Sequence, residues 1–486
     1  MIVYDSLERK FLELKPRRGN NLELFVCGQT VYDDAHIGHA KVYTNVSVII
    51  RYIRHLGYNL KSVENVTDID DKIIARAKER GMAPIDLARF YEHRLMEDLD
   101  ALDIKRDIDQ FLRSHDYIDA IRIQLQQLID NGYAYMLDGD IYYNVAKFKD
   151  YTKLSGISLD DLTNHRIEPK EGKINTYDFA LWKGSKDGEP FWEIILKISG
   201  KSVLIKGRPG WHIEDTAITA SVFGPTYDIH CGAKELIFPH HTNEIAQAEA
   251  ASGKKPFVRY WLHSGVLRLN GEKMSKSLGN FITIRDVLSK FFPEELKLMI
   301  ESSQYSKEID YRDELMAEAK LKLSDMYASL SLFYNMPNSN TSTDAYIKLD
   351  ARIFEFERDF KAAMDDNFNT SLAITHLYSV LKFIKLFAKE ENHIQNDQKT
   401  EILDRVLKLS NIIGILQMEY YKKSCPSEAK VIMDERLMHR KANDFKKSDE
   451  LRSSLADNFG IGVEDDKKSS LWYWLYPKFT NKKYSN

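Results

Sequence analysis

The tetrapeptide His36-Ile37-Gly38-His39 places two imidazoles on either side of a glycine. It lies where an apolar, β-prone stretch, residues 22–26, leads through a turn into a helical pattern. Unpaired backbone N–H groups and the helix dipole make the start of a helix a good site for phosphate. Two histidines there can donate hydrogen bonds to phosphate oxygens, and Gly38 leaves room for a nucleotide. The tetrapeptide therefore indicates a nucleotide-phosphate site.

A second polar string, Lys273-Met274-Ser275-Lys276-Ser277, lies in a loop between a predicted strand at 258–266 and a predicted helix at 283–288. Two lysines on a loop suit the stabilisation of negative charge that builds up on a leaving pyrophosphate. We therefore expect Lys273 and Lys276 to act as catalytic residues together with His36 and His39.

The segments around these strings alternate between strand and helix. Strand patterns at 22–26 and 60–66 are each followed by a helical pattern, and the alternation resumes with a strand from Tyr227, a helix at 239–252 and the strand at 258–266. This rhythm predicts a parallel α/β sheet with right-handed crossovers. Residues 84–210 interrupt the rhythm, and we interpret them as an insertion between two halves of one sheet.

The second half of the chain has a nearly continuous helical pattern. We expect a catalytic domain at 1–292, a helical bundle at 293–418 and a small module at 419–486. A basic helix is predicted at 435–455, close to the aromatic residues 472–474. Such a helix can hold phosphates while the aromatics stack on unpaired bases, although a solvated amphipathic helix fits the same pattern.

The two strings, in this order after strands of one sheet, resemble the signatures of class I aminoacyl-tRNA synthetases. Four further segments resemble cysteinyl-tRNA synthetases: residues 25–33, 65–72, 207–214 and 238–244. The resemblance covers essentially the whole chain. It implies a Rossmann-like class I catalytic domain, a helical stem-contact bundle and an anticodon-binding module. It also implies an ATP-dependent ligase that makes cysteinyl-adenylate from L-cysteine and transfers the cysteinyl group to the 3′ end of tRNA(Cys).

Some of the same residues suggest a metal. His240 and Glu244 are four residues apart on a predicted helix and share one face, and Cys27 ends a strand beside the proposed ATP site. Thiolate, imidazole and carboxylate together suit zinc. The resemblance implies one Zn²⁺ at these positions, with a fourth ligand, a cysteine, where this sequence has Asp215. A carboxylate preserves the formal ligand charge. Cys231 is an alternative ligand, or a small buried thiol at a strand end.

Zinc would explain a choice between two very similar amino acids. Cysteine and serine differ by one atom, and an apolar pocket separates such near-isosteres by only roughly 10²-fold. Zinc binds a thiolate far better than a hydroxyl and lowers the pKa of a thiol. The resemblance further places three residues around bound cysteine: Gly28, Thr67 and Trp211. It places four around ATP, which binds with Mg²⁺: His36, Gly38, His39 and Lys276.

Composition sets the remaining expectations. Hydrophobic residues make up 43% of the chain and charged residues 29%, which is ordinary for a globular protein, and the net charge of −4 does not by itself indicate a nucleic-acid partner. No apolar run reaches the roughly 18 residues of a membrane span, the N-terminus lacks a signal pattern, and three scattered cysteines favour a reducing compartment. We therefore expect a cytoplasmic protein without membrane contact. We also expect a monomer, although none of these features determines the oligomeric state.

Two other functions share part of this pattern. One is a ligase that activates cysteine in the same way but joins it to an amino sugar in low-molecular-weight thiol synthesis. Such ligases lack the full C-terminal region, whereas about 190 residues follow Phe292 here. The other is a non-catalytic tRNA-binding paralogue, which only Asp215 suggests. The presence of His36, His39, Lys273 and Lys276 argues against it.

Overall fold

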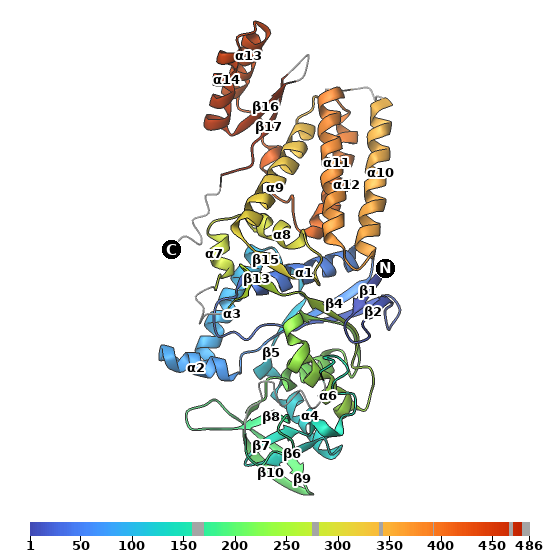
Figure 1. Ribbon diagram of the computed structural model, residues 1–486, viewed down its shortest axis with the longest axis vertical. Helices are drawn as coiled ribbons and strands as arrows, with labels where there is room; N and C mark the ends of the chain where they lie inside the picture. The colour runs from blue at the N-terminus through green and yellow to red at the C-terminus, as the bar shows by residue number, and fades with distance from the viewer. Residues whose placement is uncertain (158–169, 275–280, 340–343, 392, 466–469, 479–486) are drawn as a thin grey trace. The chain divides into compact units, whose positions relative to one another are not determined.

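The computed structural model describes residues 1–157, 170–274, 281–339, 344–391, 393–465 and 470–478 (Figure 1). The chain divides into two compact units. The first comprises Met1–Arg268, Glu272–Ile284 and Tyr305–Ile309, and the second comprises Leu269–Gly271, Arg285–Gln304 and Asp310–Asn486. The division thus falls across residues 269–310 and not at one point after 292, because the chain passes between the two units several times in this stretch.

A five-stranded parallel sheet forms the centre of the first unit. Its spatial order is β12 (Val258–Ser264), β11 (Tyr227–Ala233), β3 (Asn21–Val26), β4 (Asn59–Val66) and β5 (Gln110–Arg113). The predicted parallel α/β sheet is confirmed. The sheet grows in one direction from β3 to β5 and in the other from β3 to β12. Ligands of open α/β sheets bind at such a reversal, outside the carboxyl ends of the strands.

Helices connect these strands, and their ends follow local sequence rules. They are α1 (Ile37–His55), α2 (Asp71–Arg80), α3 (Pro84–Ala101), α5 (Ile213–Val222) and α6 (Thr242–Ser252). In α2, the Asp70 carboxylate accepts a hydrogen bond from the Lys72 backbone N–H, and Gly81 ends the helix with φ 64°. These are an ordinary N-cap and a left-handed C-cap, respectively.

In its described residues, the insertion consists of an antiparallel sheet and the long helix that packs on it. The helix is α4 (Ile118–Asp130), and the strands in spatial order are β6 (Ala134–Leu137), β7 (Asp140–Tyr143), β8 (Phe179–Gly184), β10 (Lys201–Pro209) and β9 (Trp192–Ile198). The expected start of the insertion at residue 84 was too early, because β5 pairs with β4 in the central sheet. Four residues, Gln-Phe-Leu-Arg, are too short to show a strand period.

The insertion and the central sheet share one hydrophobic core. Fully buried members include Trp182 and Leu196 from the insertion and Phe25, Tyr227 and Trp261 from the central strands. This common core fixes the insertion, and the helix α5 that follows it, against the sheet.

The second unit begins with a helical bundle. Its helices are α8 (Pro293–Glu301), α9 (Asp313–Tyr334), α10 (Asp344–Asp365), α11 (Thr370–Glu391) and α12 (Asn396–Ile413). Among the described residues, only α11 is long and apolar enough to cross a bilayer, with a mean hydropathy of 1.3. The helix lies beside α9 and α10 (Figure 1), and one face of it is buried, as in a core helix.

The chain then forms a small module with a core of its own. It contains α13 (Ser427–Lys441), α14 (Phe445–Ser454), β16 (Ile461–Asp465) and β17 (Ser470–Trp474). The single helix expected at 435–455 was wrong. Asn443 adopts a left-handed conformation with φ 63°, and the Asp444 carboxylate accepts a hydrogen bond from the Lys447 backbone N–H, so a new helix starts there.

The other short elements are β1 (Ile2–Asp5), β2 (Lys10–Glu13), β13 (Leu267–Leu269), β14 (Glu272–Lys273), α7 (Ile284–Leu288) and β15 (Ile309–Tyr311).

Candidate active site and metal centre

His36 and His39 cap the start of α1 reciprocally. The His39 backbone N–H donates to His36 Nδ1 at 3.2 Å, and the His36 backbone N–H donates to His39 Nδ1, also at 3.2 Å. The two rings stack with centroids 3.8 Å apart. Because each Nδ1 accepts a backbone proton, each neutral ring carries its own proton on Nε2. The caps therefore prepare two Nε2–H groups as hydrogen-bond donors.

The surroundings keep His39 neutral. Burial lowers the pKa of His39 well below its ordinary value, and the nearby His36 and Lys72 lower it further. Gly38 is required by the packing of this turn, because a Cβ there would lie only 2.8 Å from His36 Cε1 and 2.9 Å from its Nδ1. The glycine thus makes room for the capping ring as well as for a nucleotide.

A cavity of about 320 Å³ opens beside these histidines. It lies at the carboxyl ends of β3, β11 and β12, where the sheet order reverses. Its lining includes Cys27, Gly28, His36, Gly38, His39, Lys72 and Trp211. The structure therefore brings His36, Gly38 and His39, which were predicted to bind phosphate, and part of the predicted cysteine-binding set to one cavity.

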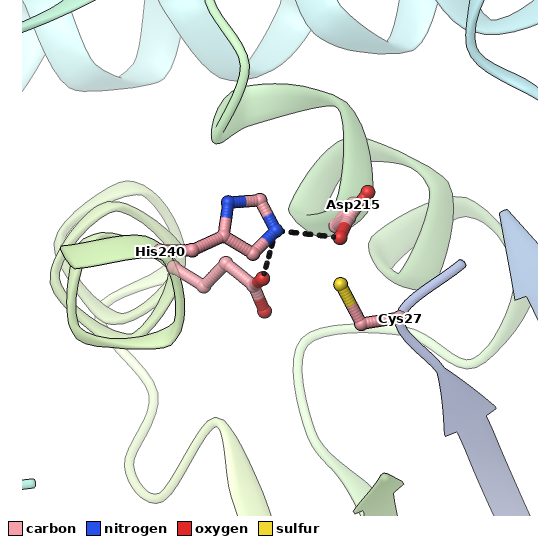
Figure 2. A group of neighbouring side chains, drawn as sticks. Cys27, Asp215 and His240 are labelled. Atoms are coloured by element: carbon pink, nitrogen blue, oxygen red, sulfur yellow. Dashed lines mark hydrogen bonds and ion pairs between the residues drawn. The ribbon is translucent and has the colours of Figure 1, made fainter. Parts of the chain in front are cut away.

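Four predicted metal ligands converge at this end of the sheet. Cys27 follows β3, Asp215 lies in the first turn of α5, His240 lies in the turn Ile237–His241 that leads into α6, and Glu244 lies in the first turn of α6. Their donor atoms all lie within 4.8 Å of one another. His240 Nε2 is 3.1 Å from Asp215 Oδ2 and 2.9 Å from Glu244 Oε1. Figure 2 shows Cys27, Asp215 and His240 pointing toward one another.

The electrostatics of the cluster fit a cation. Burial raises the pKa of the Cys27 thiol, and the Asp215 charge raises it further. Burial likewise raises the pKa of Glu244 to about 8. Burial opposes a charge on His240, but Cys27, Glu244 and Asp215 together raise its pKa. Acidic groups this close and this buried repel each other unless a positive charge lies between them, and the donor set suits zinc.

His212 supports this cluster, although the sequence reasoning assigned it no role. Its Nδ1 is 2.8 Å from Nδ1 of His240. If His240 Nε2 faces a metal, its Nδ1–H donates to His212 Nδ1, so His212 takes the outer position that a carboxylate, a carbonyl or water usually fills. His212 precedes Asp215 by three residues, so helical spacing puts the two on neighbouring positions. That spacing gives no sign of the contact with His240.

Cys231 does not join the cluster among the described residues. It lies on β11, is 1% exposed, and its carbonyl accepts a hydrogen bond from the Cys27 backbone N–H at 2.9 Å. Its side chain behaves as a packed thiol, whose pKa burial raises. The arrangement favours Asp215 over Cys231 as the fourth ligand.

The three residues expected around bound cysteine lie at different depths. Gly28 and Trp211 line the cavity, and Trp211 stacks on His240 with centroids 4.4 Å apart. A Cβ at Gly28 would lie 1.9 Å from the Asn65 carbonyl oxygen, so no other residue fits there. Thr67 is not among the described residues that line the cavity, and its hydroxyl donates to Glu214 Oε1 at 2.5 Å. Thr67 therefore contacts other buried side chains behind the cavity wall.

Comparison with known proteins identifies the family. The chain is 39% identical over 482 residues to the cysteine–tRNA ligase of Thermococcus onnurineus strain NA1, covering 97% of this chain and 98% of that protein. It is 38% identical to the cysteine–tRNA ligase of Acinetobacter baumannii strain AYE, with the same coverage. The chain belongs to the cysteine–tRNA ligase family. The resemblance to cysteinyl-tRNA synthetases is confirmed.

Domain comparisons agree with this family. Residues 13–321 match the catalytic domain of class I (C) tRNA synthetases, and residues 359–417 match the DALR domain. A methionyl-tRNA synthetase from Mycobacterium tuberculosis, solved with methionyl-adenylate, has a TM-score of 0.56 to this chain at 16% identity. That match covers 81% of this chain and 89% of the other, and it supports the class I fold.

One part of the family signature cannot be placed. The backbone of Lys273 ends β14, whereas its side chain and all of Lys276 lie outside the described residues. The role of the two lysines in this family member therefore stays a prediction from the sequence.

Proposed function

We propose that this chain attaches L-cysteine to the 3′ end of tRNA(Cys) in two steps, using ATP. One observation carries the proposal: a single cavity is lined by the histidines that cap α1 and by Cys27 of the metal cluster. The near full-length relatives at 38–39% identity support the same reaction. tRNA, an amino acid and ATP are the substrates that the family implies.

In the first step, the cysteine carboxylate attacks the α-phosphate of ATP in line. A new carboxylate–phosphate bond forms, and the bond to the β-phosphate breaks to release pyrophosphate. We assign the Nε2–H groups of His36 and His39, with the start of α1, to hold the phosphate oxygens. His39 can fill this role as a neutral ring, because its Nε2–H donates a hydrogen bond whether or not the ring is charged. ATP enters with Mg²⁺ as part of the substrate.

We assign Lys273 and Lys276 to stabilise the charge that builds up on pyrophosphate. In the second step, a hydroxyl of the terminal tRNA ribose attacks the acyl carbon, and AMP leaves. Gly28 and Trp211 would border the bound amino acid in both steps, and Thr67 would support them from below. Most of the catalytic effect then comes from positioning and charge stabilisation.

Cys27, Asp215, His240 and Glu244 would hold one zinc ion. When bound, zinc supplies a soft Lewis acid that prefers a thiolate to a hydroxyl and lowers the pKa of a thiol. The burial of all four side chains fits a site that excludes water from the amino acid's sulfur. Selection at binding would remove the need for a separate proofreading site.

The alternatives have less support. A thiol-synthesis ligase would lack the C-terminal region, whereas the tRNA ligases match 97% of this chain. A non-catalytic paralogue was suggested only by Asp215, and that residue lies with the other ligand candidates. We further propose that the protein acts as a cytoplasmic monomer.

The test is exchange of labelled pyrophosphate into ATP. We expect cysteine to drive exchange and serine to drive it at least roughly 10⁴-fold less efficiently, the discrimination that protein synthesis needs. Equal exchange with both amino acids would overturn the assignment of cysteine. Exchange with neither, in protein shown to contain zinc, would favour the non-catalytic paralogue.

A further inference from the structure

Asn65 makes three side-chain contacts beneath the cavity. It lies near the end of β4 and is 1% exposed. Its Nδ2 donates to Asp215 Oδ1 at 2.6 Å and to Thr67 Oγ1 at 3.2 Å. Its Oδ1 accepts from the Gly28 backbone N–H at 2.7 Å. One amide thus joins the ends of β3 and β4 to the first turn of α5.

These contacts give the two oxygens of Asp215 different roles. Oδ1 is occupied by the Asn65 amide, whereas Oδ2 faces His240 Nε2 at 3.1 Å within the metal cluster. A thiolate has a single donor atom and needs no such choice. A carboxylate can present one oxygen or both, and a hydrogen bond to one of them decides which.

We propose that Asn65 is the positioning residue that makes Asp215 a one-oxygen metal ligand. The amide holds Oδ1 out of the cluster and leaves Oδ2 as the donor. Through Gly28 it also fixes the backbone next to Cys27, so one side chain orients ligands from two separate segments. This role rests on the proposed metal site. Asn65 is needed for it because residue 215 is an aspartate, whose two oxygens must be oriented, and not a cysteine.

The contact is well protected for such a role. Asn65, Asp215 and Thr67 are each at most 1% exposed, so water does not compete for their hydrogen bonds. Asn65 and Thr67 are two residues apart on an extended segment and therefore face the same side. Thr67 in turn donates to Glu214, the neighbour of Asp215, which holds the start of α5 from a second point.

Cobalt binding to the purified full-length protein tests the proposal. Co²⁺ reports affinity by titration and coordination number by its visible absorption, because four-coordinate sites absorb more strongly than five-coordinate ones. We expect Asn65→Ala to lower Co²⁺ affinity by about 10- to 100-fold and to weaken the absorption. The KM for cysteine should rise while the KM for ATP stays near wild type.

Asn45→Ala is the matched control. Asn45 is also a buried amide, and it donates to Ser264 Oγ at 2.8 Å, away from the four ligand candidates. Its loss should leave Co²⁺ affinity and absorption unchanged. In an Asp215→Cys background, the same Asn65→Ala change should cost much less Co²⁺ affinity, since a thiolate does not need orienting between two donor atoms.

Three results would overturn the role of Asn65 while leaving the proposed metal site in place. One is an Asn65→Ala protein with wild-type Co²⁺ affinity and absorption, and another is an equal loss in both backgrounds. The third needs no variant and holds even if Asn65→Ala fails to fold: a crystal structure of zinc-loaded wild-type protein in which both Asp215 oxygens ligate the ion. Wild-type protein that binds no Co²⁺ would overturn the metal site itself, and this role with it.

Discussion

At the scale of single residues, the chemistry of the site depends on how a carboxylate differs from a thiolate. Asp215 offers a harder donor than a cysteine while keeping the same charge. A zinc ion with one sulfur ligand fewer would be somewhat more electron-poor and no worse at ionising a substrate thiol. On the proposed assignment, Asp215 would therefore serve the cluster around His240 as a metal ligand.

Substituting Asp215 tests this directly. Asp215→Ala should lose zinc, measured by metal analysis, and raise the KM for cysteine by roughly 10²-fold while changing the KM for ATP little. Asp215→Cys should restore both. Cys231→Ala serves as the control and should be nearly silent. Zinc bound through Cys231, with Asp215 turned away, would refute this assignment.

Glu64 gives a pH-dependent prediction. It is fully buried on β4, and burial raises its pKa to about 8 although the Tyr43 hydroxyl opposes the shift. The folded chain then keeps a proton that the unfolded chain releases near pH 4.5, so stability falls as pH rises from about 4.5 to about 8. Glu64→Gln removes this term.

Thermal unfolding at pH 6 and pH 8 measures the effect. The gain in stability from Glu64→Gln should be roughly 2 kcal/mol larger at pH 8 than at pH 6, from about 1.4 kcal/mol per pH unit. The exposed Glu79→Gln should show no such difference. An equal gain at both pH values would mean that Glu64 is already ionised in the folded protein.

The sequence predicted the chemically distinctive residues better than their supports. His36, His39, Cys27, His240 and Glu244 have types or spacings that already indicate phosphate or metal, whereas Asp215 was expected only from the family resemblance. Asn65 and His212 are ordinary polar residues in sequence, and their importance comes from partners 150 and 28 residues away. Long-range pairing of this kind depends on the fold and leaves no local pattern.

At the scale of elements, one buried ion pair holds the C-terminal module together. Arg436 on α13 is fully buried and donates to both carboxylate oxygens of Asp465 on β16, each at 2.7 Å. Arg440, one turn later, reaches Asp465 at 3.2 Å but is 38% exposed. The pair therefore links α13 to β16.

Arg436→Ala should destabilise the module by about 3–5 kcal/mol, because the partner carboxylate stays buried without its main cation. Hydrogen exchange over residues 427–465 should speed up, and tRNA charging should fall while pyrophosphate exchange is unchanged. Arg440→Ala should cost less than about 1 kcal/mol. Equal effects of the two changes would contradict a special role for the buried arginine.

The elements that sequence patterns missed are short or interrupted ones. β5 has only four residues, and the break between α13 and α14 depends on the left-handed backbone of Asn443. Helices of the bundle were predicted well as a group because their apolar positions repeat over many turns. A hydrophobic periodicity must repeat several times to be recognised, so it cannot reveal a four-residue strand or a break of a few residues between two helices.

At the scale of the whole molecule, amino acid activation and tRNA charging should be separable. Ending the chain after Lys423 removes α13, α14, β16 and β17, which share a small core of their own. We expect pyrophosphate exchange to stay near wild type. Charging of tRNA should fall roughly tenfold or more, since losing even one stacked base costs about 1–3 kcal/mol. Unchanged charging would rule out anticodon binding by this module.

The strand order of the central sheet also determines when the metal cluster can assemble during synthesis on the ribosome. β3, which leads to Cys27, pairs with β11, and the last ligand candidate, Glu244, follows more than 200 residues after Cys27. At about 5–20 residues per second, a ribosome needs on the order of 10–40 s to bridge that gap. Until then Cys27 is a lone thiol at the end of a strand that has β4 on one edge and no neighbour on the other. Metal capture would therefore mark the moment at which both halves of the sheet have met.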